Sequence, residues 1–310
     1  MSREDYAAQV SLLVRVLPHI AKEEVFALKG GSAINLFYRD IPRLSVDIDL
    51  TYLPIKDRDE SLAEISEAMG RITAALLRGL RQGQAHRIAG GGGGDTRLLV
   101  TQGRARIKIE TSPVARGVVH APELRQVTAA VEDEFGFAEI RVVSFEDLFA
   151  GKLHAAVDRQ HPRDLFDVKL LYENEGLTET LFRTFLVYVA CSPRPPHELL
   201  APNRIDLEQA YAQEFVGMTS REVSLAELID TRERLVTDIR SRLDEKARAF
   251  LLSLHDGAPD FEVIGLPQAA DLPAVRWKQV NLRRLIAQNP DKHAAQRAML
   301  REAFGGSSSD

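Results

Sequence analysis

Two aspartates spaced by one residue are the first candidates for chemistry in this sequence. Asp47 and Asp49 alternate with the apolar residues Val46, Ile48 and Leu50. Side chains two residues apart on a strand point to the same face, so the two carboxylates share a face and repel each other. A magnesium ion would relieve this repulsion, because Mg²⁺ binds a few carboxylates together with phosphate oxygens. The alternative is a solvated strand edge at which both aspartates pair with arginines.

A glycine turn precedes these aspartates. Gly30 and Gly31 end a short apolar run, and Ser32 is a good N-cap residue for the helix that the following residues predict. Backbone N–H groups at the start of a helix can hold a phosphate group. Carboxylates for a metal and a turn for phosphate are the parts that phosphoryl-type transfer requires.

The segment RARIKIE, residues 104–110, offers a third carboxylate. Its charged residues alternate strictly with apolar ones, which predicts a strand whose charged side chains share one face. Glu110 ends that face and can join Asp47 and Asp49 around a metal ion.

A second set of charged residues lies in the segment 144–171. Lys152 and Arg159 share one side of a predicted helix, and after a His-Pro break Asp164 and Asp167 share one face of the next helix. Two cations and two acids would therefore meet at a tight helical corner. The alternative is a set of salt bridges on the helix surface.

These motifs resemble those of a known enzyme superfamily. A Gly-Gly-Ser turn followed by S-x-D-x-D, in a strand-helix-strand context, resembles the DNA polymerase β-like nucleotidyltransferase superfamily. The pattern K-L-x-A-x-x-x-R-x-x-x-R-D-x-x-D, which begins at Lys152, resembles the AbiEii/AbiGii-type nucleotidyltransferase toxins, the relatives of the MenT toxins. The resemblance covers residues 25–171, and beyond residue 171 it rests on length and helical character.

The resemblance implies a function and a set of site residues. It implies a toxin of a toxin–antitoxin system, of the kind used in phage defence, that transfers a nucleotide from an NTP to an RNA acceptor. The implied acceptor is the 3′ end of tRNA, the implied cofactor is Mg²⁺ or Mn²⁺, and the implied partner is an antitoxin encoded nearby. The implied residues are Asp47, Asp49, Lys152 and Asp167 for catalysis; Gly30, Gly31, Ser32, Lys152, Arg159 and Arg163 for nucleotide binding; and Asp47, Asp49 and Glu110 for the metal.

Two other functions stay open. The chain could transfer a nucleotide to a small molecule such as an aminoglycoside, or to a protein side chain. It could also bind nucleotides without catalysis. The intact Asp47, Asp49 and Lys152 argue against this last function, because a binding protein need not retain carboxylates for a metal.

The elements that must position these residues alternate between helices and strands in the first half of the chain. Hydrophobic spacing predicts helices at 4–22, 33–38 and 58–82, and strands at 25–28, 44–53, 96–101, 104–110 and 139–143. From Ser144 the pattern is helical, with proline breaks at 193–196 and a last helix at 275–303. We therefore expect an α+β fold: a small mixed-sheet nucleotidyltransferase core with flanking helices at 1–143, a helical domain at 144–304 that completes the active site, and a disordered tail at 305–310.

Composition narrows the class of protein further. Of the 310 residues 45% are hydrophobic, which suffices for a sizeable core, and the net charge of -5 requires any nucleic-acid surface to be local. The single cysteine, Cys191, excludes a disulfide within the chain. Neither a signal-peptide pattern nor a run of about 18 apolar residues is present, so we expect a cytoplasmic protein without membrane contact. The five glycines at 90–94 lack a P-loop lysine and predict a flexible connection.

Two basic clusters are candidates for contact with RNA. Arg276, Trp277, Lys278, Arg283 and Arg284 form an acid-free group with an aromatic residue, which suits phosphate contact and base stacking. The alternative for this group is an ordinary amphipathic helix with Trp277 in the core. The second cluster comprises Arg78, Arg81, Arg87, Arg104 and Arg106.

Overall fold

The computed structural model describes residues 3–89 and 95–305. The glycine stretch at 90–94 lies outside the described residues, as do residues 306–310 of the expected tail. Within the described part, no helix combines the length and the apolar character that crossing a bilayer requires.

The chain divides into two compact units. The first unit comprises Met1–Ser144 and Thr219–Arg221, and the second comprises Phe145–Met218 and Glu222–Asp310. The short segment Thr219–Arg221 thus belongs to the first unit although the chain around it belongs to the second. No sequence pattern predicted this return.

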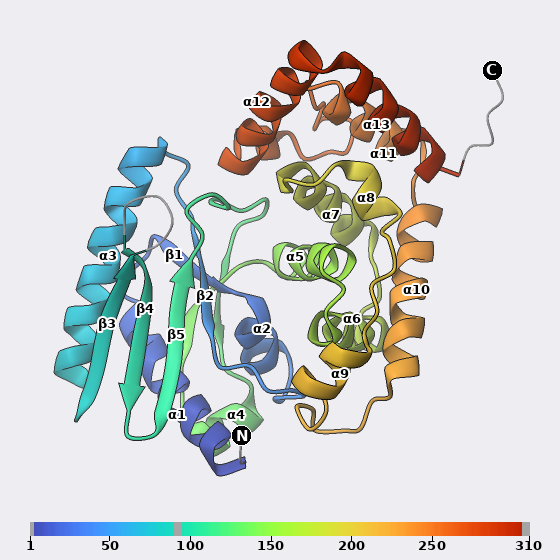
Figure 1. The fold of residues 1–310 in the computed structure, drawn as a ribbon. Helices are drawn as coiled ribbons and strands as arrows, with labels where there is room; N and C mark the ends of the chain where they lie inside the picture. The colour runs from blue at the N-terminus through green and yellow to red at the C-terminus, as the bar shows by residue number, and fades with distance from the viewer. Residues whose placement is uncertain (1–2, 90–94, 306–310) are drawn as a thin grey trace. The chain divides into compact units, whose positions relative to one another are not determined.

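A seven-stranded sheet forms the centre of the first unit (Figure 1). Its strands are β1 Phe26–Lys29, β2 Ile48–Tyr52, β3 Gly83–Ala89, β4 Asp95–Gln102, β5 Ala105–Thr111, β6 Glu123–Gln126 and β7 Glu139–Val142, and their order across the sheet is β3-β4-β5-β2-β1-β7-β6. β2 pairs with β5 in parallel, as does β1 with β7, whereas the other neighbours are antiparallel. The expected mixed sheet is confirmed.

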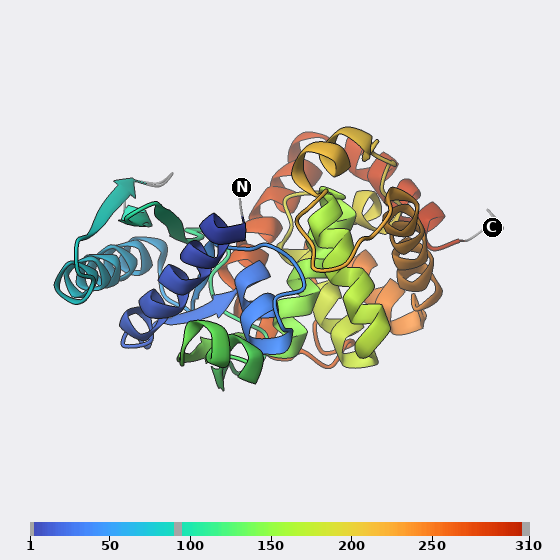
Figure 2. The same ribbon diagram turned by 90° about the horizontal axis from the view of Figure 1, so that it is seen from below.

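Two long helices pack on this sheet. α1, Arg3–Ile20, contacts β5 and β7, and α3, Arg58–Gly79, contacts β3 and β4; Figure 2 shows these two helices side by side. Buried and accessible residues alternate along β5, as its sequence predicted. The apolar residues of β5 therefore face the helices, and its charged residues occupy the opposite face. The remaining helical segments of this unit are α2 Gly30–Ala33, the π-helix η1 Ile34–Tyr38 and α4 Ala129–Phe135.

Helices build the second unit, as expected for the C-terminal half. They are α5 Phe145–Asp158, α6 Pro162–Asn174, α7 Glu179–Cys191, α8 Pro196–Leu200, α9 Glu208–Glu214, α10 Leu225–Ser241, α11 Glu245–His255, the 3-10 helix η2 Pro267–Asp271, α12 Pro273–Gln288 and α13 Pro290–Ala303. α5 packs against α6 and α7, and α10 packs against α6. Their core is filled by the buried phenylalanines Phe149, Phe166, Phe182, Phe185 and Phe250. The fold is therefore α+β.

The prediction of one final helix at 275–303 is wrong. The segment forms two helices that meet at Asn289 and Pro290. The Asn289 side chain accepts a hydrogen bond from the backbone N–H of Lys292 at 3.1 Å and so caps α13. Pro290 has no N–H with which to continue α12, which explains the break.

The segment around the two aspartates also differs from the prediction. β2 begins at Ile48 rather than at residue 44, so Asp47 lies just before the strand. α2 begins at Gly30, which makes Ser32 its third residue and not its N-cap. The strands β3 and β6 were not predicted, since their sequences show only weak alternation.

Candidate active site

The glycine turn between β1 and α2 brings the backbone against polar side chains. Gly30 has a φ of +77°, and a Cβ atom there would overlap the Oδ2 atom of Asp49. A Cβ atom on Gly31 would lie 2.6 Å from Arg43 Nη2 and 2.6 Å from Ser45 Oγ. Glycine is therefore favoured at Gly30 by backbone conformation as well as by space, whereas a side chain at Gly31 would displace the Arg43 and Ser45 side chains.

Ser32 supports the approach to β2 instead of capping a helix. Its side chain is fully buried, and its hydroxyl donates a hydrogen bond to the backbone carbonyl of Asp47. The Ser45 hydroxyl lies 3.4 Å from the Ser32 hydroxyl. Ser32 thus fixes the backbone of one of the two aspartates. The first N–H groups of α2 receive no side-chain cap from Lys29, the residue that precedes the helix.

The pairing of three strands sets a charged row across the sheet. Asp49 on β2 is paired with Lys29 on β1 and with Glu110 on β5. Residues in register on neighbouring strands share a face, so the three side chains lie next to one another. The third carboxylate that the sequence suggested is therefore beside Asp49.

A second lysine joins the carboxylates. The Nζ atom of Lys108 lies 3.1 Å from Glu110 Oε2 and 3.9 Å from Asp47 Oδ2. Arg97 on β4 approaches the same Glu110 oxygen at 3.6 Å. Asp47 itself is exposed, because it lies just before the strand. The repulsion among the carboxylates is thus balanced by cationic side chains of the same sheet.

The two lysines of this site respond differently to their surroundings. Burial lowers the pKa of Lys29 below its usual value, and the nearby charges of Asp49 and Glu110 offset only part of this effect. Burial also acts to lower the pKa of Lys108, but the hydrogen bond to Glu110 and the charge of Asp47 outweigh it, so this pKa is raised. Lys108 is therefore held firmly in its charged form.

The chemistry of these carboxylates suits a magnesium ion, but their arrangement does not yet form a metal site. Among residues 3–89 and 95–305, no group of three or more His, Cys, Asp or Glu side chains is close enough to hold a metal ion. Lys108 lies between the carboxylates of Asp47 and Glu110, so it would have to move before a cation bridged them. A metal-binding role of Asp47, Asp49 and Glu110 stays a prediction.

The second unit contains a buried ionic cluster at the corner between α5 and α6. The Nζ atom of Lys152 lies 2.8 Å from Asp164 Oδ1 and 2.9 Å from Asp167 Oδ2. Both carboxylates are at most 1% exposed, whereas the Arg159 side chain, which donates two hydrogen bonds to Asp164, is 64% exposed. The two helices therefore bring together four of the residues that the sequence placed at this corner.

The charges around Asp164 determine the pKa of its carboxyl group. Burial raises the pKa of Asp164, but the charges of Lys152 and Arg159 and their hydrogen bonds lower it by more, so the pKa lies well below its usual value. The Lys152 ammonium donates a hydrogen bond to Asp164 and forms an ion pair with Asp167, so two buried carboxylates share one cation.

Arg163 does not join this cluster. Its guanidinium lies 3.9 Å from Glu214 on α9, and the imidazole Nε2 of His161 lies 3.0 Å from the same carboxylate. His161 also caps α6 by accepting a hydrogen bond from the N–H of Arg163. The side chain of Arg163 is thus held by α9, and its nucleotide-binding role stays a prediction.

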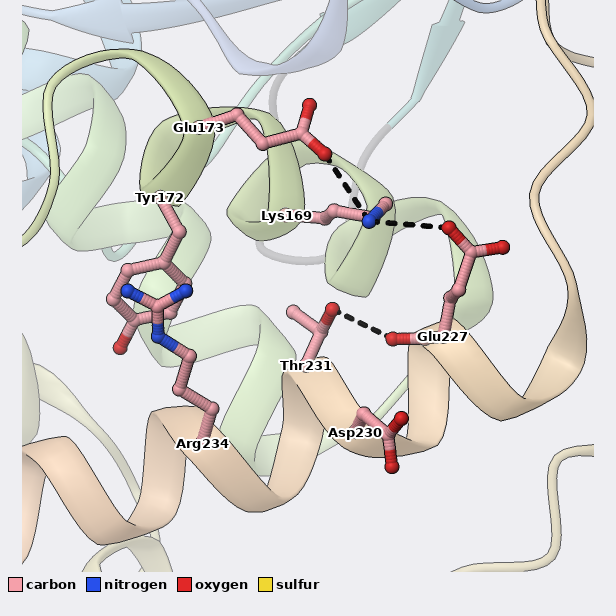
Figure 3. Close-up of a pocket in the computed structure, with 7 residues that line it drawn as sticks. All are labelled: Lys169, Tyr172, Glu173, Glu227, Asp230, Thr231 and Arg234. Carbon is pink, nitrogen blue, oxygen red and sulfur yellow. Dashed lines mark hydrogen bonds and ion pairs between the residues drawn. The ribbon is translucent and has the colours of Figure 1, made fainter.

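A separate pocket of about 210 Å³ lies between α6 and α10 (Figure 3). Lys169 binds Glu173 at 3.1 Å and Glu227 at 3.2 Å, and the Arg234 guanidinium lies 4.0 Å from the centre of the Tyr172 ring. The Lys169–Glu227 pair and the Arg234–Tyr172 contact join α6 to α10, whereas the Lys169–Glu173 pair lies within α6. None of the residues that the sequence implied for catalysis lines it.

The two basic clusters differ in their surroundings. Arg81 and Arg104 line a shallow groove of the first unit together with Arg15, a residue that the sequence patterns did not single out. In the other cluster, Trp277 is 59% exposed, so the alternative of a core tryptophan is wrong. Lys278 is buried instead.

Sequence reasoning missed Lys29 and Lys108 as members of the site. Lys29 directly precedes the glycine turn, and Lys108 lies on the charged face of the predicted strand, two residues from Glu110. The positions of both lysines can be read from the sequence. That they lie beside the carboxylates depends on the order of strands β1, β2 and β5 in the sheet.

Comparison with known proteins agrees with this fold and these motifs. The family model described as "Nucleotidyl transferase AbiEii toxin, Type IV TA system" matches residues 11–279, and the chain belongs to this family. A search of curated proteins finds no significant match. Among solved structures, the chain is similar to MenT4, a nucleotidyltransferase toxin from Mycobacterium tuberculosis H37Rv, with a TM-score of 0.61 and 16% sequence identity over 88% of this chain and 95% of that one. This likeness shows a shared fold.

Membership defines the class of protein: a nucleotidyltransferase toxin of a type IV toxin–antitoxin system. Such a toxin has an antitoxin as its partner and a nucleotide as its substrate.

Proposed function

We propose that this toxin transfers a nucleotide from an NTP to an RNA acceptor, the 3′ end of tRNA, and thereby blocks translation. The family supports nucleotide transfer. The observation that carries the proposal is the register that sets Asp49 beside Glu110, directly next to the glycine turn. Carboxylates and uncapped backbone N–H groups in one place suit an NTP with its metal.

The proposed roles follow from the contacts of each residue. Gly30, Gly31 and the N–H groups that follow them hold phosphate oxygens. Lys152 contacts a phosphate with its ammonium group, and the exposed Arg159 guanidinium can do the same while it stays bonded to Asp164. Asp167 orients Lys152, because its buried carboxylate binds that ammonium at 2.9 Å.

Asp47, Asp49 and Glu110 would hold Mg²⁺ once Lys108 has moved aside. When bound, the metal would neutralise phosphate charge and stabilise the attacking and leaving oxygens. A hydroxyl oxygen of the acceptor forms a bond to the α-phosphorus, the bond from that phosphorus to the bridging oxygen of the β-phosphate breaks, and pyrophosphate leaves. The hydroxyl proton passes to solvent or to a carboxylate of the site.

The proposal is tested by incubating the full chain with each α-³²P-labelled NTP in the presence of total tRNA, an aminoglycoside or the protein alone. We expect label on tRNA that is removed by digestion of its 3′ end. Asp49→Asn should abolish labelling, whereas Asp59→Asn, which changes a carboxylate that is 98% exposed on α3, should not.

Label on the antibiotic or on protein, with none on RNA, would overturn the RNA acceptor and leave nucleotidyl transfer intact. Equal labelling by the Asp49→Asn and Asp59→Asn proteins would remove Asp49 from the reaction.

A further inference from the structure

The exposed face of helix α12 carries a basic and aromatic stripe. Its members are Arg276, Trp277, Val280, Arg283 and Arg284. Val280 is three or four residues from each of the other four, so all five share one side of the helix. We infer that this stripe docks a single-stranded segment of the RNA acceptor, an inference that rests on the RNA acceptor proposed above.

The buried side of α12 determines which of its residues are exposed to solvent. Val275 and Leu282 are buried, and so is Lys278. The Lys278 ammonium donates hydrogen bonds to the backbone carbonyl of Ser192, at 2.7 Å, and to that of Arg194. The lysine of this cluster therefore anchors the helix, and the arginines and the tryptophan are left on the accessible side.

The charge of the stripe suits a polyanion. α12 contains no aspartate or glutamate. Arg276 is paired with Asp271 at 2.7 Å, but within the described part of the chain no carboxylate pairs with Arg283 or Arg284. The Arg283 side chain passes close to Gly257, since its Cγ atom lies 3.5 Å from where a Cβ of that glycine would be. Two guanidinium groups are thus available to phosphates along the helix.

Trp277 distinguishes a single strand from a duplex. A large indole that is 59% exposed offers a flat surface on which an unpaired base can stack. Bases of a duplex are stacked on each other and cannot reach such a ring, whereas the arginines alone would serve either form. The combination of one ring with flanking arginines therefore favours unpaired nucleotides.

The sequence provides its own reporter for this surface, because Trp277 is the only tryptophan in the chain. Selective excitation of the indole follows this residue alone. We expect an unstructured oligoribonucleotide of about 12 nucleotides to quench its fluorescence in a saturable manner. A blunt RNA duplex of the same total charge should quench much less.

Two substitutions separate stacking from charge. Trp277→Ala should weaken binding of the oligonucleotide, followed by fluorescence anisotropy of a labelled RNA, by about 5-fold or more, and Trp277→Phe should restore part of it. Two phosphate contacts, from Arg283 and Arg284, predict a slope of log K against log salt of about −1.4, and Arg283→Gln with Arg284→Gln should bring it to about zero. The matched control, Arg58→Gln with Arg71→Gln on α3, removes the same charge from two arginines outside both basic clusters and should leave the slope unchanged.

Three results would overturn the inference: no quenching by the oligonucleotide, an unchanged affinity after Trp277→Ala, or an equal loss of slope in the control protein. Indole emission that changes with protein concentration alone would also overturn it, because this face would then be an interface between copies of the chain. Transfer of label to tRNA is measured independently, so failure here leaves the proposed reaction standing.

Discussion

Asp49 and Glu110 occupy paired positions on the parallel strands β2 and β5, although 61 positions of sequence separate them. Lys29 flanks the same pair from β1. The carboxylates of this sheet therefore lie among cations of the same face, and each of these side chains is positioned by backbone pairing rather than by a loop. This arrangement leads to the first two predictions.

Gly30→Ala should disturb the site directly. A methyl group there requires an L-residue at a φ of +77° and overlaps the Asp49 carboxylate. We expect the free energy of unfolding to fall by about 2–4 kcal/mol and nucleotidyl transfer to be lost.

The control for this prediction is Gly217→Ala, measured by urea denaturation alongside it. Gly217 also has a φ of +77°, but no heavy atom lies within 4 Å of its Cβ position. Its cost should be limited to backbone strain, about 1–2 kcal/mol, with activity retained. Equal destabilisation of the two proteins would contradict the close approach of Asp49.

Lys108→Gln should increase the affinity of the site for divalent cations. The Lys108 ammonium, 3.1 Å from Glu110 and 3.9 Å from Asp47, competes with any cation that these carboxylates bind. Removing it should tighten Mn²⁺ binding, measured from the free-ion EPR signal, by about 5-fold or more. Lys22→Gln removes an exposed lysine elsewhere and should have no effect. Weaker Mn²⁺ binding by the Lys108→Gln protein would show that the lysine supports the metal instead.

Lys152→Ala should destabilise the fold as well as stop the reaction. It leaves two carboxylates buried without their shared cation, which typically costs about 3–5 kcal/mol. Arg159→Ala removes the other partner of Asp164, but that side chain is 64% exposed, so we expect a loss of about 1 kcal/mol or less. Urea denaturation of both proteins gives the comparison. A loss for Lys152→Ala no larger than that for Arg159→Ala would mean that water reaches the cluster.

Acid should weaken the contact between α11 and α13 through a pair of histidines. The rings of His255 and His293 stack at 4.2 Å, and each Nε2–H donates to the backbone carbonyl of the other residue, at 3.0 and 3.1 Å. Burial lowers the pKa of His255; its bond to His293 and the charge of Asp256 oppose this, and the charges of His293 and Arg297 add to it. The folded state thus resists a proton that the unfolded chain accepts.

The sign of the pH effect follows from this lowered pKa. The contribution of His255 is fully present above the unfolded pKa, about 6.5, and is lost as the pH falls towards the folded value. His255→Phe should therefore reduce the slope of unfolding free energy against pH below about 6.5, by up to about 1.4 kcal/mol per pH unit. His86→Phe, which changes an exposed ring, should not. An unchanged slope for His255→Phe would show that His255 takes up its proton equally in the folded and unfolded states.

Local patterns were sufficient for much of the fold and of the site. The alternation in residues 104–110 predicted the strand that carries Lys108 and Glu110, and helical spacing brought Lys152 and Asp164 to one corner. These predictions depend on residues close in sequence, where the periods of strand and helix decide which side chains share a face.

The parts of the fold and of the site that could not be predicted depend on contacts between residues distant in sequence. The partner of Arg163, Glu214, lies on another helix, and no local pattern indicates it. The exposure of Trp277 could not be predicted because the buried side of α12 includes Lys278, whose charge suggested an accessible side chain. Strand order likewise decides that Lys29 faces Asp49, and it is set by pairing across the whole first unit.

Because Thr219–Arg221 belongs to the first unit, the chain cannot be divided at residue 144 without loss of contacts in that unit. Thr219 bridges to Arg43, and the Ser220 N–H donates to the carbonyl of Pro42 at 2.9 Å. The Arg43 guanidinium in turn lies against Gly31. A gene fragment that stops at Ser144 would encode the whole sheet yet omit the tripeptide that braces the loop behind the glycine turn. Truncation would thus deprive the nucleotidyltransferase core of a tie supplied from far downstream.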